Sequence, residues 1–303
     1  MSELDLPDFD PKATRRAVRR GLLKTASLVL AGLLALVLVL VVAPILVQRG
    51  GTDRMYDVYA TAFKMYTPGY RVQVGECCEV TPWSKSLPLT ATQLRAYGGF
   101  YGRAEAPYKI TKNLFGGLDH LPLGNEANTS VAAALSMVGH KDPIGKEEAR
   151  EILAGLPKAM RALALVEFSR PATAEQVVAF GRRYEACPER IVYEARPGSL
   201  PITFGSFMWE RSPVEPKSGW CHGNPPEILA EFRSWDKILQ PSDADDLRDF
   251  DLTLDRVRKA AKDGLAYAYL DQGVKVERLR KLLEDPQVLS VAIIDVTFDI
   301  ATF

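Results

Sequence analysis

The sequence has few of the residues that build metal sites or activated nucleophiles. It contains three histidines, His120, His140 and His222, which lie far apart in the chain. No C-x-x-C or H-E-x-x-H spacing is present, so the usual zinc sites are not indicated. A G-x-S-x-G nucleophile elbow, a P-loop and a dinucleotide-binding fingerprint are also absent. We therefore predict a non-enzymatic protein with no catalytic residues, no cofactor and no metal site.

An excess of charge of either sign is also missing. The 38 lysines and arginines balance the 38 aspartates and glutamates. Nucleic-acid-binding domains usually carry a basic surplus, and disordered acidic chains carry an acidic one. We therefore expect no direct nucleic-acid binding, and the composition by itself names no partner.

One short match to a catalytic motif needs an interpretation. The residues SWDK at 234–237 fit the S-x-x-K of penicillin-binding enzymes, and KSG at 217–219 resembles their third motif. That chemistry requires the serine at a helix N-terminus and the third motif later in the chain, whereas here the order is reversed. We interpret the match as coincidental. A membrane-tethered envelope enzyme is the alternative that these residues and the scattered histidines would support.

The most prominent feature that is present is an apolar run between Lys24 and Arg49, where 24 consecutive positions lack a charged side chain. At about 1.5 Å per residue, a helix of this length covers roughly 36 Å, more than the roughly 30 Å hydrocarbon core of a bilayer. A cleaved export signal has a shorter apolar stretch, and the candidate cleavage site at residues 41–43 is followed by Pro44. We therefore expect residues 25–48 to be a retained transmembrane helix.

Basic residues mark the N-terminal border of this run more strongly than the C-terminal border. The nearest basic residues after the run are Arg49, Arg54 and Lys64. The positive-inside rule then predicts a single-pass protein of the cell membrane, with a cytoplasmic N-terminus and an extracytoplasmic C-terminal part. The basic residues before the run would also hold it against anionic lipid headgroups. These juxtamembrane residues are Arg15, Arg16, Arg19, Arg20 and Lys24.

All four cysteines follow the apolar run, on the side of the membrane where disulfide bonds persist. Four cysteines allow three pairings. A bond between the neighbours Cys77 and Cys78 is geometrically awkward, so we favour a disulfide between Cys187 and Cys221.

The composition divides the chain into segments. Residues 1–24 form an acidic and then basic tail, which we place in the cytoplasm ahead of the transmembrane helix. Residues 49–145 begin with a helical pattern and continue with short β-type runs among many Gly and Pro residues. This pattern predicts a membrane-proximal, irregular, β-containing region. Residues 146–303 have clearer periodicity and are predicted to form a C-terminal α+β domain.

Two stretches of the C-terminal domain follow the same plan of strand, helix and strand, at residues 162–195 and 265–298. In the first, Thr173 and Gln176 form a capping-box pattern at the start of the predicted helix. The apolar period changes from strand-like to helical and back, as in βαβ units. Two such units predict the α+β class, with a ferredoxin-like split βαβ arrangement.

Several of these features occur together in one known family. They are the short tail, the N-terminal span, the YTPGY break at residues 66–70 and a final unit that ends in LRKLLEDPQVLSVAIIDVTF. Together they resemble the sigma factor regulator (anti-sigma factor) family of bacterial single-span membrane proteins. Over about residues 160–300, LALVEFSRPATAEQVVAF resembles the opening strand and helix of that family. AYAYLDQGVKVERLRKLL resembles its closing strand, Gly turn and helix.

The resemblance implies signal transduction to transcription, in which an outer domain reports the state of the envelope to a sigma factor or to a second membrane anti-sigma subunit. One departure concerns residues 1–24, which are too short for a helical sigma-clasping domain and contain no zinc-binding anti-sigma motif. The tail could instead fold as a linear element on its partner, or the span could pair laterally with a second membrane protein. A structural or assembly module of the cell envelope is a further alternative.

Overall fold

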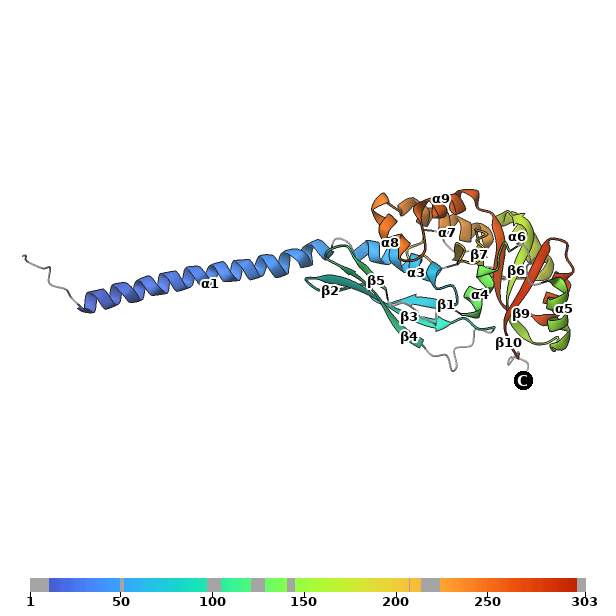
Figure 1. Ribbon diagram of the computed structural model, residues 1–303, viewed down its shortest axis with the longest axis horizontal. Coiled ribbons are helices and arrows are strands. Elements are labelled where there is room, and N and C mark those ends of the chain that lie inside the picture. Colours follow the sequence, from blue (N-terminus) through green and yellow to red (C-terminus); the bar gives the residue numbers. More distant parts are fainter. Residues whose placement is uncertain are drawn as a thin grey trace, which may run out of the picture.

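The computed structural model describes residues 11–49, 52–96, 105–120, 129–140, 145–206, 208–213 and 224–298. Over these residues the chain is a mixed α+β protein with two antiparallel sheets, which confirms the predicted fold class. One long N-terminal helix extends away from a body that contains both sheets (Figure 1).

Helix α1 (Pro11–Arg49) is the element that extends from the body. Its stretch from Val18 to Ala43 is long and apolar enough to cross a membrane, and none of it is buried in the protein. Apolar surface exposed to water costs about 25 cal/mol per Å², so the exposure of this stretch to water is unfavourable. The basic residues between positions 15 and 24 lie on the first turns of the same helix and are exposed.

A second helical stretch follows α1. Helix α2 (Thr52–Arg54), a π-helical turn (Met55–Tyr59) and helix α3 (Ala60–Tyr66) form one continuous helix, because the bordering residues keep right-handed helical dihedral angles. We call residues 52–66 the junction helix. It ends before Pro68-Gly69, as the sequence predicts. Gly69 is required there because a Cβ atom would collide with the side chain of Thr129.

The first sheet takes up much of the region that the sequence predicts to be irregular. Its strands pair antiparallel in the order β1-β3-β4-β5, and β2 also pairs with β3. The residues of β1, β3 and β4 alternate between buried and more exposed positions, so one face of this sheet covers the core. The strands are β1 (Tyr70–Val74), β2 (Glu79–Val80), β3 (Ser84–Gln93), β4 (Glu105–Asn113) and β5 (Leu118–His120).

The second sheet has the strand order β10-β6-β9-β7-β8, and every neighbouring pair is antiparallel. Helix α6 (Ala174–Tyr184) connects β6 to β7, and helix α10 (Val276–Leu283) connects β9 to β10. The predicted capping box at the start of α6 is present, with Thr173 and Gln176 bonded in both directions. The strands are β6 (Arg161–Ala172), β7 (Pro188–Val192), β8 (Thr203–Gly205), β9 (Ala266–Lys275) and β10 (Val288–Thr297).

Further helices cover the second sheet. On one face, alternate residues of β6, from Ala162 to Phe168, join a core that also contains residues of the first sheet and the junction helix. On the other face, Leu163 and Leu165 pack with α4 and with residues 94–96. The sheets and the junction helix are therefore one packed body. The remaining helices of the body are α4 (Ser130–Ser136), α5 (Lys146–Gly155), α7 (Pro225–Ile238), α8 (Ala244–Arg248) and α9 (Leu254–Asp263), of which α4, α5 and α7 contact the second sheet.

The cysteines correct one expectation. Cys77 and Cys78, in the connection between β1 and β2, form a disulfide bond with each other. The argument that disfavoured this bond on geometric grounds is therefore wrong. Cys187 is also disulfide-bonded. Its predicted partner, Cys221, lies outside the described residues.

Candidate functional site

The junction helix lies in the centre of the core. Every residue from Tyr59 to Met65 is at most 4% exposed, and Met55 and Val58 are fully buried. The ring of Phe63 packs against Tyr108 of β4 and, edge-on, against Phe250, with ring centroids 6.1 and 6.5 Å apart. The chain that leaves α1 therefore enters the core directly. Any tilt of this helix relative to the body would disturb tightly packed side chains.

Polar contacts attach the first turns of the junction helix to α7 and to the turn that follows it. Arg54 donates a hydrogen bond to the carbonyl oxygen of Ile238 at 2.9 Å and forms an ion pair with Asp243. Trp235 of α7 donates its indole N–H to the carbonyl oxygen of Asp57 at 2.8 Å. These bonds hold the start of the junction helix in a fixed position on α7.

A buried polar cluster lies in the middle of the junction helix. The Tyr59 hydroxyl donates to Asp246 at 2.5 Å and accepts from Lys112 Nζ at 3.0 Å. Lys112 also forms an ion pair with Asp246, and its Nζ lies 5.1 Å from the centroid of the Tyr59 ring. We call Tyr59, Lys112 and Asp246 the junction cluster. It joins the junction helix, β4 of the first sheet and α8.

Electrostatics keep the Tyr59 hydroxyl of the junction cluster protonated. Burial, and then the hydrogen bond and negative charge of Asp246, raise the pKa of the Tyr59 phenol, so this hydroxyl remains a donor. Lys85 of β3 lies directly opposite Lys112 in the sheet register. Burial, and then the charge of Lys112, lower the pKa of Lys85. The carboxylate of Asp246 thus pairs with Lys112 and opposes the lowering of the Lys85 pKa.

The last turns of the junction helix are attached to the second sheet. The buried Arg190 of β7 donates to the carbonyl oxygen of Lys64 at 3.0 Å. Burial lowers the pKa of Arg190 to about 10, so its guanidinium remains protonated at neutral pH. Lys64 forms an ion pair with Glu210 at 2.5 Å. Burial lowers the pKa of Lys64, and Glu210 opposes this effect.

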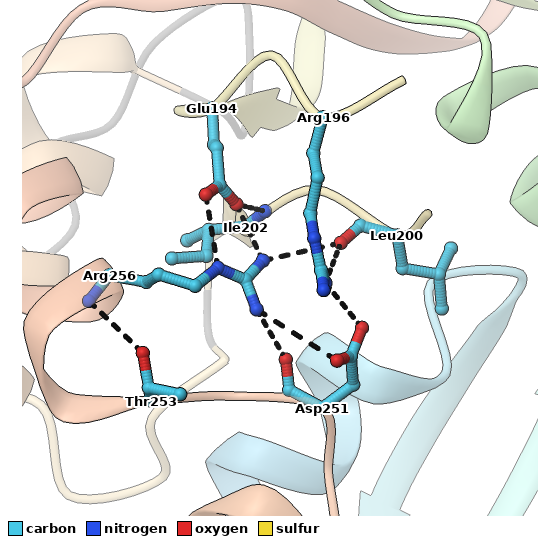
Figure 2. Close-up of polar contacts among 7 residues, drawn as sticks. All are labelled: Glu194, Arg196, Leu200, Ile202, Asp251, Thr253 and Arg256. Atoms are coloured by element: carbon cyan, nitrogen blue, oxygen red, sulfur yellow. Dashed lines mark hydrogen bonds and ion pairs between the residues drawn. The ribbon is translucent and has the colours of Figure 1, made fainter. Parts of the chain in front are cut away.

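A second polar cluster lies between the segment after β7 and the start of α9 (Figure 2). Arg256 binds both carboxylate oxygens of Glu194, at 3.0 and 2.6 Å, and donates to the carbonyl oxygen of Asp251 at 2.6 Å. Arg196 forms an ion pair with Asp251 at 2.5 Å and donates to the carbonyl oxygen of Leu200 at 3.3 Å. Both guanidinium groups point toward protein acceptors. This cluster therefore fixes α9 on the second sheet.

A cavity of about 410 Å³ opens between α5 and α10, lined partly by Arg150, Arg280 and Glu284. Arg150 is bonded to Glu284, and Arg280 donates to the carbonyl oxygens of Leu153 and Leu156. Both arginines are thus occupied in joining the two helices, and the cavity offers a ligand little beyond its apolar wall.

The residues of the S-x-x-K match do not form the arrangement that the motif requires. Ser234 lies in the middle of α7, half-buried, and Lys237 is exposed near its C-terminal end. The KSG residues at 217–219 and His222 lie outside the described residues. Within the described part of the chain, no group of three His, Cys, Asp or Glu side chains is placed to hold a metal ion.

Sequence reasoning did not find the junction cluster. Lys112 and Asp246 are 134 positions apart, and Tyr59 and Asp246 are 187 apart. The signal available in the sequence was a predicted helix directly after the apolar run that carries charged and tyrosine residues on more than one face. The predicted juxtamembrane residues Arg15 to Lys24 lie at the other end of α1, away from the junction.

Comparison with known proteins gives no assignment. No protein-family model matches the chain, and no curated protein or solved structure matches it significantly.

Proposed function

We propose that the protein is a single-pass membrane regulator, with a cytoplasmic N-terminal tail and an extracytoplasmic body that senses or binds a component of the envelope. In this proposal the body influences sigma-dependent transcription through a sigma factor or a second membrane anti-sigma subunit. The resemblance of the sequence to sigma factor regulators motivates the partner.

The observation that carries the proposal is the burial of the junction helix directly after α1. A passive anchor needs only a flexible linker between the membrane and the folded domain. Here only six residues separate the end of the sequence-predicted span, at position 48, from the buried Met55 at the start of the core. A ligand that changes the packing of the body would therefore change the position of α1, and the reverse also holds.

The proposed architecture of the body is a ferredoxin-like split βαβ. The strand order β10-β6-β9-β7 supports it, because β9 lies between the helix-linked strands β6 and β7. In the same way, β6 lies between the helix-linked strands β9 and β10. On this reading, β8 and helices α7 to α9 are additions, and they supply Asp243 and Asp246 to the junction.

The exposed surface of α1 is consistent with a lateral partner in the membrane. None of its apolar stretch is covered by the body, so a second membrane helix has free access to it. The basic residues from Arg15 to Lys24, on the first turns of α1, would lie at the cytoplasmic surface.

Orientation and partner can be tested together in cells. Alkaline phosphatase fused after Phe303 is expected to be active, whereas the same enzyme fused to the N-terminus is expected to be inactive. Photo-reactive probes placed within residues 1–20 are expected to capture a sigma factor or an anti-sigma subunit. The proposal is wrong if deletion leaves every extracytoplasmic-function sigma regulon unchanged under envelope stress and no such partner is captured.

Coupling through the junction has a matched control. Asp246→Asn weakens the junction cluster, and Glu194→Gln weakens the second polar cluster to a similar degree by the same loss of charge. We expect only Asp246→Asn to change the transcriptional response to envelope stress, at equal protein abundance. Equal responses in both variants would show that the junction does not transmit the signal.

A further inference from the structure

Three large apolar side chains lie together on the surface of the first sheet. Trp83 is 60% exposed, Phe115 is 88% exposed and Leu114 is 36% exposed. They belong to two adjacent turns, because Leu114 donates its backbone N–H to the carbonyl oxygen of Trp83 at 2.8 Å, and Ser84 pairs with Asn113 in the register of β3 and β4. We call Trp83, Leu114 and Phe115 the apolar tip.

Both turns are built to hold these side chains outward. In the first, Thr81 Oγ1 accepts from the backbone N–H of Ser84 at 2.9 Å. In the second, Asn113 Oδ1 accepts from the backbone N–H groups of Phe115 and Gly117, each at 2.9 Å. Gly116 has a φ of +92°, which glycine adopts without strain. The apolar tip is therefore a fixed feature of the sheet, and its side chains do not fold back onto the body.

The apolar tip lies at the end of the body that faces α1. Strand β2, which leads into the first turn, contacts α1, and Cys77 Sγ lies 3.7 Å from the carbonyl oxygen of Thr52. Figure 1 shows the β2 end of the first sheet beside the C-terminal end of α1, with α5 at the opposite end of the body. Within the described residues of the body, no second group of exposed aromatic side chains lies near α1.

The depth of this end of the body fits a bilayer surface. The uncharged run ends at position 48 and the helix ends at Arg49. The C-terminal end of α1 therefore lies at the border between the hydrocarbon and the headgroup layer, which is roughly 5–8 Å thick on each side of a bilayer. Tryptophan and other aromatic side chains are enriched at this level of membrane proteins.

We propose that the apolar tip inserts into the headgroup layer of the same bilayer that α1 spans. The inference rests on the membrane anchoring in the proposed function and adds a second contact between the body and the lipid. With α1 alone, the body is free to rotate about the helix axis. With the apolar tip inserted, its rotation and tilt are fixed by the lipid surface, so a change in lipid packing acts on the body.

The experiment uses the full chain in lipid nanodiscs that contain lipids brominated near the headgroup. Subtracting the emission of Trp83→Phe from that of the unchanged protein isolates Trp83. We expect brominated lipid to quench about half of this emission, as for an interfacial tryptophan. Phe115→Asp should remove most of the quenching. Ile152→Asp, which changes an exposed apolar residue of α5 at the opposite end of the body, should leave it unchanged.

Flotation of the same samples after a carbonate wash reports the insertion of α1 separately. If the chain floats but Trp83 is open to aqueous acrylamide and insensitive to brominated lipid, the tip proposal is wrong and the anchoring stands. A chain that does not float overturns both. If Trp83 is shielded in native membranes but not in pure lipid, the tip binds a protein, and the lipid assignment is wrong.

Discussion

The two sheets of the body are covered in different ways. The first sheet alternates along β3 and β4, with one face toward the core and one toward solvent. The second sheet is buried on both faces, and β6 is buried at every position from Ala162 to Phe168. The helices and residues 94–96 that cover its second face cause this difference. The sequence of an antiparallel strand is therefore a nearly continuous apolar run when both faces of the strand are packed.

The two sheets also differ in their buried charges. Near the first sheet and the junction helix, buried charged groups have counter-ions, as in the pairs Arg54–Asp243 and Lys112–Asp246. In the second sheet, Asp271 of β9 is 3% exposed and accepts a hydrogen bond from the backbone N–H of Cys187 at 3.0 Å. Burial raises the pKa of Asp271 to about 7, while that hydrogen bond opposes the rise. The comparison predicts that pH acts on the second sheet through Asp271.

The largest expected effect on stability tests whether one or both faces of each sheet are buried. Ala164→Asp and Leu165→Asp, on opposite faces of β6, are each expected to lower the free energy of unfolding by more than about 4 kcal/mol, because a buried unpaired carboxylate has lost its hydration. On β3, Leu89→Asp should cost as much, whereas Thr90→Asp should cost about 1 kcal/mol or less. Urea unfolding of the full chain in detergent micelles measures these changes. Tolerance of a charge on one face of β6 would contradict two-sided burial.

The next effect tests the paired charges. Asp246→Ala leaves Lys112 without its counter-ion and Tyr59 without its acceptor, and we expect a loss of about 3 kcal/mol in the free energy of unfolding. Lys112→Met combined with Asp246→Ala should lose less than Asp246→Ala alone, because the uncompensated charge is gone. The same urea titrations measure both variants. Strictly additive losses would show that the two side chains do not interact.

A smaller effect concerns Asp271. Its pKa in the folded state, about 7, lies above its ordinary value of 3.8, so folding favours the protonated form. The contribution of Asp271 to stability is therefore largest below about pH 4, falls as the pH rises toward 7 and is then constant. Asp271→Asn removes this slope. Above pH 7 we expect the variant to be about 2 kcal/mol more stable, roughly half of what the full pKa shift implies, because the new amide NH₂ must also be accommodated.

Urea unfolding of both proteins from pH 4 to pH 8 measures the Asp271 effect. The variant should be the more stable protein above about pH 5.5 and the less stable one below it, because at low pH Asp271 is protonated in both the folded and unfolded states and only the cost of the amide remains. A difference that is independent of pH would show that another group controls the stability of the second sheet.

The smallest effect is expected on the outer face of the first sheet. Lys109 of β4 forms an ion pair with Glu79, but their side chains are 45% and 65% exposed. Lys109→Ala should therefore change the free energy of unfolding by about 0.5 kcal/mol or less. Lys112→Ala, on the same strand but in the junction cluster, is the matched comparison and should cost more than Lys109→Ala. Equal costs would remove the distinction between the two faces.

The elements that the sequence predicts are those with a strong local signal. The apolar stretch of α1, the capping box at Thr173 and the two strand-helix-strand patterns of the C-terminal region all depend on residues that are close together in the chain. The first sheet was expected only as an irregular region, because β3 forms from a Gly- and Pro-rich segment whose strands are specified by pairing with β1 and β4. The disulfide bond between Cys77 and Cys78 was disfavoured from the sequence, because the conformation of the loop that contains them could not be predicted.

The sequence by itself determined that this chain is α+β and begins with a helix long and apolar enough to span a membrane, because a 3.6-residue period and an uncharged run are local properties. Only the tertiary structure decided where the next helix goes. The junction helix is buried because two sheets and α7 close around it, and Tyr59, Lys112 and Asp246 meet there from distant parts of the chain. Contacts of this kind depend on the packing of the whole body, which no local pattern specifies.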